Sequence, residues 1–126
     1  MSGHLTAERN VRRGEVVTTD GTATTIKTIP IPLGKTMRIF STVTAKRIAG
    51  SSGSSGDSAS YTIDGTYKNV AGTVSLIGSL ETTAQEDQVG WTSTHTISGI
   101  TVLVRGTGAT SNTVKWISTS DVQELS

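Results

Sequence analysis

Two histidines are the first residues to consider for chemistry, because imidazole most often serves as a general base or metal ligand near neutral pH. His4 lies in a polar N-terminal segment, and His95 lies in a stretch of alternating polar and apolar residues. Neither has a second histidine at metal-ligand spacing, and the chain contains no cysteine, so we predict no metal site. Spacing alone does not exclude a serine–histidine–acid site, but the chain has no nucleophile-elbow motif. We therefore expect no enzymatic activity and no cofactor.

One glycine-containing segment resembles a phosphate-binding loop in part. Gly34-Lys35-Thr36 matches the end of that signature, but Ile29 stands where the first glycine is needed. Two prolines precede the segment and a strand pattern follows it, whereas a phosphate-binding loop leads into a helix. The sequence therefore predicts a plain turn.

Two polar loops are the candidate interaction sites. Residues 49–57 (AGSSGSSGD) predict a flexible loop, and loops on a rigid β scaffold often carry binding residues. Residues 82–90 predict a second loop, in which adjacent carboxylates would point in alternate directions and form no general acid/base pair. A cation site is one interpretation of this loop, but we favour hydrogen bonds within the loop or to a neighbouring subunit. The candidate residues are Ser51, Ser52, Ser54, Ser55, Glu86, Asp87 and Gln88.

Trp91 and Trp116 each have two interpretations. They are the largest apolar side chains of a sequence with only 4% aromatic residues, so we expect both in the core. The alternative is that they form exposed platforms on which sugars stack.

The composition fits one domain without nucleic-acid or membrane contacts. A chain of 126 residues is long enough for a single core. The net charge is +1, without the clustered basic face that nucleic acid requires. No apolar run approaches the roughly 18 residues of a membrane span. Residues 1–14 lack the apolar stretch of a signal peptide, so we expect synthesis in a cytoplasm without export by that route.

Apolar and polar residues alternate with period two from Val16 onward, as in strands with one buried face. About eight such segments follow one another at spacings of roughly 8–14 residues, with no long helical pattern. We predict an antiparallel β-sandwich or jelly-roll-like domain over residues 16–126. Its expected core contains Ile26, Ile39, Val43, Tyr61, Leu76, Trp91, Val102, Val104 and Trp116.

Residues 1–15 (MSGHLTAERNVRRGE) predict an extended N-terminal arm, because they contain too few apolar residues to hold themselves against the domain. Leu5 and Val11 would fill small pockets on a neighbouring subunit. Arg12 and Arg13 would make bidentate contacts to its carboxylates. The alternative is a terminal tail without a role.

Several segments of residues 20–125, in their order and spacing, resemble a β-rich module of tailed-bacteriophage structural proteins. They are TATTI and IPIP near the start, KR with the following GSSG and GDSASY in the middle, and EDQVGW, VLVRG and VKW toward the end. That module occurs in small stand-alone virion proteins and in larger tail or tail-fibre proteins. The resemblance implies a place in the virion, assembled in the host cytoplasm.

The resemblance and the arm together favour a capsid decoration (cement) protein, which would bind the major capsid protein and copies of itself, as a homotrimer. A tail or tail-fibre module that binds a host receptor or glycan is one alternative. A carbohydrate-binding module that uses the two tryptophans is another.

Overall fold

The computed structural model describes residues 7–126, with side chains from Asn10 onward, so His4 and Leu5 lie outside the described residues. Nine β-strands and no helix make up this part of the chain. The strands are β1 (Ala7–Thr18), β2 (Thr24–Pro30), β3 (Thr36–Gly50), β4 (Ser58–Val70), β5 (Thr73–Leu76), β6 (Glu81–Glu86), β7 (Thr92–Ser98), β8 (Thr101–Thr107) and β9 (Asn112–Leu125).

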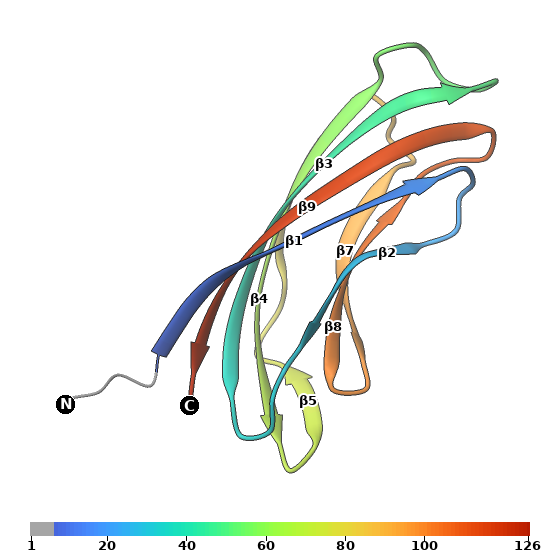
Figure 1. Ribbon diagram of the computed structural model, residues 1–126. Coiled ribbons are helices and arrows are strands. Elements are labelled where there is room, and N and C mark those ends of the chain that lie inside the picture. The colour runs from blue at the N-terminus through green and yellow to red at the C-terminus, as the bar shows by residue number, and fades with distance from the viewer. Residues whose placement is uncertain (1–6) are drawn as a thin grey trace.

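The strands form two antiparallel sheets, which lie face to face (Figure 1). The large sheet has six strands in the order β1-β9-β3-β4-β5, and β6 also pairs with β4. The small sheet has three strands in the order β2-β8-β7. The expected all-β, sandwich-like class is confirmed, with nine strands where the sequence suggested about eight.

The long strands β3, β4 and β9 separate two ends of the sandwich. At one end lie the β3–β4 and β8–β9 connections, and backbone hydrogen bonds from Ser51 and Ser52 to Ser111 O (2.9 and 3.0 Å) join them. At the other end lie the β2–β3 and β4–β5 turns, joined by Gly34 N–H donating to Asn69 O (2.9 Å). We call these the loop end and the turn end. The start of β1 and the end of β9 lie toward the turn end (Figure 1).

The core forms where the inward faces of the two sheets meet. Along β3 every second side chain is buried, from Met37 to Ala45, as the alternation predicted. The core expected from the sequence is confirmed except for Leu76, which is only partly buried. Trp91 and Trp116 are 1% and 0% exposed, with ring centroids 6.1 Å apart. The alternative of two exposed sugar-stacking platforms is therefore wrong.

Two expected segments differ in the structure. Residues 7–15, expected in an arm, belong to β1 and pair with β9 along their whole length, so the boundary expected after residue 15 falls inside a strand. The arm is therefore corrected to a sheet strand for its described part. Residues 81–86 form β6, where the sequence predicted loop, because nearly all the side chains of β6 are exposed and no alternation marks it.

Candidate interaction surface

The loop end brings together the two loops that the sequence singled out. Ser54 N–H and Gln88 Nε2 both donate to Asp57 Oδ2, at 2.8 and 2.6 Å. Asp87 N–H donates to Ser58 O, and Ser58 N–H donates to Asp87 Oδ2, each at 3.0 Å. Although 29 residues separate Ser58 from Asp87, these bonds hold the β3–β4 and β6–β7 connections together.

Arg47 donates two hydrogen bonds to the backbone of the glycine- and serine-rich loop. Its Nε donates to Ser52 O (2.8 Å), and one terminal nitrogen donates to Gly50 O (2.6 Å). Gly50 has φ of 120°, and a Cβ there would lie 2.3 Å from Ser111 O, so the close approach of the two loops requires glycine. The loop is thus held by specific hydrogen bonds, where composition alone predicted flexibility.

The charges of this surface are compensated locally. Donation from the Ser54 backbone N–H and from Gln88 lowers the pKa of Asp57 below its ordinary value. Tyr61 O–H donates to Glu86 Oε2 (2.7 Å), and burial, followed by this contact, raises the pKa of Tyr61. Glu86 is therefore directed at the edge of the core, and Gln88 is half-buried where it donates to Asp57. The other candidate loop residues are exposed: Ser51, Ser52, Ser54, Ser55 and Asp87.

The structure separates the other predicted contact residues from these loops. Val11 and Arg13 lie on the exposed side of β1. Arg12 lies on the opposite side of β1, where its Nε donates to Asn10 Oδ1 (2.7 Å). Leu5 lies outside the described residues. Alternation along β1 therefore sends the two adjacent arginines to different faces of the sheet, so they do not act as a pair.

A buried polar cluster between the sheets escaped the sequence analysis. His95 on β7 lies with Nε2 2.8 Å from Ser41 Oγ on β3 and with Nδ1 2.8 Å from Tyr67 O–H on β4. Ser41 Oγ is also 2.7 Å from Ser120 Oγ on β9. Ser41 occupies an inward position in the otherwise apolar row of β3, and this polar residue at a buried position is the one sequence feature that indicates the cluster.

This cluster holds the sheets together. Ser41 is fully buried, so its hydroxyl is closed off from solvent. Burial lowers the pKa of His95 to about 4, an effect that Asp64 partly offsets, so the imidazole is neutral at pH 7. A neutral imidazole has one N–H donor and one acceptor, which satisfies both ring nitrogens without a buried charge.

Among residues 7–126, no group of three or more histidine or acidic side chains is placed to hold a metal ion. Within the same residues, no helix has the length and apolar character that a membrane crossing needs.

Comparison with protein-family models and with curated proteins gave no match. Among solved structures, the chain is similar to a tailspike protein, gp49 of Acinetobacter baumannii bacteriophage Fri1, described as a capsular polysaccharide depolymerase. The TM-score is 0.49 at 18% identity, over 94% of this chain and 18% of that chain. The tailspike of Acinetobacter baumannii phage AM24 gives 0.45 at 9% identity, over 94% of this chain and 26% of that one. The tailspike of Acinetobacter phage vB_ApiP_P1 gives 0.44 at 14% identity, over 92% and 21%.

The chain thus spans only a small part, 18% to 26%, of the length of these tailspikes, and the likeness concerns the fold. No capsid decoration protein is among these three. The expectation that the chain is no enzyme is corrected here, because the Fri1 tailspike is described as a depolymerase. That description belongs to the tailspike as a whole, and no activity is assigned to this chain from it.

Proposed function

We propose that the chain is a binding module of a tailed-phage particle, located in the tail or its fibres, and that the loop end contacts a protein or glycan of the host surface. Its partners in the particle are other virion proteins and copies of itself. The phage context rests on the sequence resemblance over residues 20–125. The binding role rests on the geometry of the loop end.

The observation that carries the proposal is the convergence of the two candidate loops on one surface. Hydrogen bonds from Gln88 to Asp57, between Asp87 and Ser58, and from Arg47 to the loop backbone fix the surface before any partner arrives. A surface fixed in advance loses less conformational entropy on binding. Its exposed serines and loop carboxylates offer donors and acceptors suited to a polar partner.

The pairing of β1 with β9 favours a binding module over a capsid decoration protein. A decoration protein was expected from an arm that would clamp neighbouring subunits. Residues 7–15 are instead paired with β9 inside the domain, so this part of the chain is not available for a clamp. The main argument for decoration is therefore lost, whereas the loop end remains accessible.

Cell binding with two matched variants tests the proposal. Val89 is 84% exposed at the loop end, and Leu33 is 68% exposed at the turn end. Because neither side chain is buried, Val89→Arg and Leu33→Arg should both fold with an unchanged melting temperature. We expect the fluorescently labelled protein to bind cells of the bacterium that the phage infects. Val89→Arg should weaken that binding, and Leu33→Arg should not.

Equal binding by both variants would show that the loop end is not the contact surface. No binding by the unchanged protein, in the presence of binding by whole particles, would contradict the proposed function itself.

A further inference from the structure

The outer face of the large sheet, on the side away from the small sheet, carries several exposed apolar side chains. Val11 and Val17 on β1 are 49% and 50% exposed. Phe40 on β3 and Ile117 on β9 are 37% and 44% exposed. Exposed apolar side chains gathered on one face of a soluble domain mark an interaction surface.

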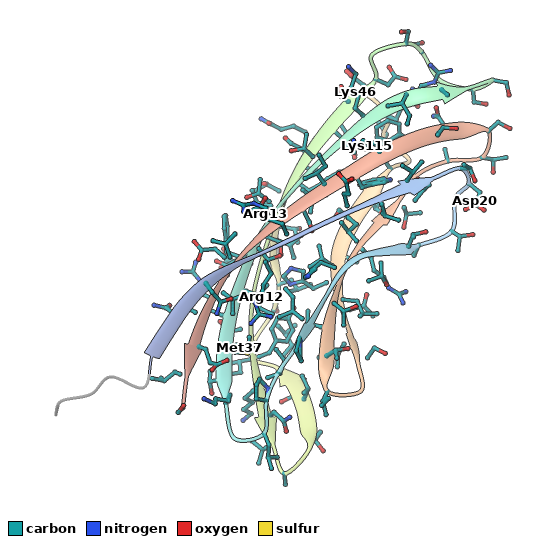
Figure 2. The ribbon with its side chains drawn as sticks, viewed as in Figure 1. Arg12, Arg13, Asp20, Met37, Lys46 and Lys115 are labelled. Carbon is teal, nitrogen blue, oxygen red and sulfur yellow. The ribbon has the colours of Figure 1, made fainter. Side chains whose placement is uncertain are left out.

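Two lysines of the outer face lie side by side toward the loop end. Lys46 and Lys115 are direct partners in the β3–β9 register, and like charges directly opposite destabilise a sheet. Glu15 Oε2 lies 3.9 Å from Lys115 Nζ, at an exposed position where such a pair contributes little. Figure 2 shows Arg13, Lys115 and Lys46 on three neighbouring strands, β1, β9 and β3. The two lysines gather positive charge toward the loop end, whereas Arg13, the register partner of Thr119, lies nearer the turn end than Glu15.

Farther along the same strands, toward the turn end, the outer face carries Phe40 between two aspartates, with Arg38 beside them. Phe40 is the register partner of Asp121 on β9 and of Asp64 on β4. A hollow of about 320 Å³ opens beside the ring, lined by Arg38, Phe40, Asp121 and Gln123. Asp64 accepts from Arg38 Nε (3.1 Å), and Asp121 also has an interaction within the chain. The Phe40 side chain remains 37% exposed.

We propose that the outer face pairs with the same face of a second copy of this chain. The two-fold axis would lie in the interface and cross the strands at the level of Val43 and Ser118, which are register partners. This operation places each strand over the same strand of the other copy with its direction reversed. Phe40 and Asp121 of one copy then face Lys46 and Lys115 of the other.

The pairing makes each contact complementary. On β1, Val11 faces Val17 of the second copy, and Arg13 faces Glu15 of the second copy. On β9, Lys115 of the second copy faces Asp121. On β3, Lys46 of the second copy reaches Phe40, where an ammonium over an aromatic ring is attracted by its face. The aliphatic part of this lysine would fill the hollow beside Phe40. Because Lys46 and Lys115 each gain a partner in the second copy, the repulsion between them is reduced.

The size of the outer face predicts a weak dimer. The rows from Val11 to Val17 span about 20 Å, and four strands lie about 4.8 Å apart, so each copy contributes on the order of 500 Å². Twice that area, about 1,000 Å², is near the lower limit for a specific interface. We expect a dimer that dissociates on dilution in the micromolar range and weakens at high salt.

A charge exchange on β1 tests the pairing. In Arg13→Glu, the new carboxylate of each copy faces Glu15 of the other copy, and in Glu15→Arg the new guanidinium faces Arg13. Each variant alone should dimerise roughly tenfold more weakly in sedimentation velocity. The two variants mixed should form a heterodimer, because every facing pair is then opposite in charge. The double variant Arg13→Glu/Glu15→Arg should dimerise as the unchanged protein does.

Thr96→Glu is the control, because Thr96 is an exposed strand position on the small sheet. It should leave dimerisation unchanged, and circular dichroism should show all variants folded. A monomer at every concentration, a trimer as the sequence analysis expected, or two single variants that do not combine on mixing would each overturn the pairing. Since the cell-binding experiment changes other residues, at the loop end and the turn end, neither result decides the other.

Discussion

Protonation of His95 should make the domain unstable in mild acid. His95 is 6% exposed, and its two ring nitrogens each lie 2.8 Å from a hydroxyl, of Ser41 and of Tyr67. A second ring proton would require both hydroxyls to accept and would leave a positive charge between the sheets. The structure therefore favours the neutral ring, and the pKa falls from 6.5 to about 4.

The sign and size of the effect follow from proton linkage. Because the folded-state pKa is below the unfolded-state pKa, the unfolded chain binds more protons as the pH falls from 6.5 toward about 4. The stability contributed by the neutral ring is fully present above 6.5 and is lost across this window. The difference between the two pKa values corresponds to about 3 kcal/mol, of which about 2 kcal/mol should be lost by about pH 5.

Urea unfolding at pH 7 and at about pH 5, followed by circular dichroism, measures this loss. His95→Gln removes the titrating group and leaves His4 in both proteins. We expect the variant to lose about 2 kcal/mol less than the unchanged protein over this interval, whatever its stability at pH 7. If both proteins lose the same free energy of unfolding, His95 is not a buried neutral residue and the reasoning fails.

Three further predictions concern packing and the surface. Trp116→Ala should cost about 3–5 kcal/mol of the free energy of unfolding, because the ring is fully buried and its Nε1–H donates to Thr18 Oγ1 (3.0 Å); urea unfolding measures this, and an unchanged midpoint would place the ring outside the core. Gly106→Ala should lower the melting temperature, because the new Cβ would lie 2.6 Å from Cδ2 of Trp116; a melting temperature at or above that of the unchanged protein would mean that the ring moves freely. Arg38→Ala should leave the melting temperature almost unchanged although it breaks the ion pair with Asp64, because the pair is exposed to solvent; a drop of several degrees would contradict this.

The fold class could be predicted because most strands have one face exposed to solvent and one face buried in the core. Along β3 and β9 this difference produces the period-two pattern that the sequence shows. β6 lacked the signal because both of its faces are exposed. The sequence of β1 predicts an arm because only Thr18 is buried among its described side chains, Asn10–Thr18. Its pairing with β9 depends on residues at the other end of the sequence.

The candidate loops could be predicted from their composition, but their contact could not. Whether Gln88 reaches Asp57 depends on the pairing of β4 with both β3 and β6, which spacing along the chain does not reveal. For His95 the alternation similarly predicts a strand position but no partners. Its two hydroxyl partners lie 54 and 28 residues away, on strands of the other sheet.

The copy number of the chain in purified phage particles tests the central claim most directly. Quantitative mass spectrometry with isotope-labelled peptides gives the ratio of this chain to the major capsid protein and to the tail proteins. A module of the tail or its fibres should be present in the particle at a small multiple of a tail protein and far below the major capsid protein. A copy number comparable to that of the major capsid protein would indicate capsid decoration, and absence from the particle would contradict the account.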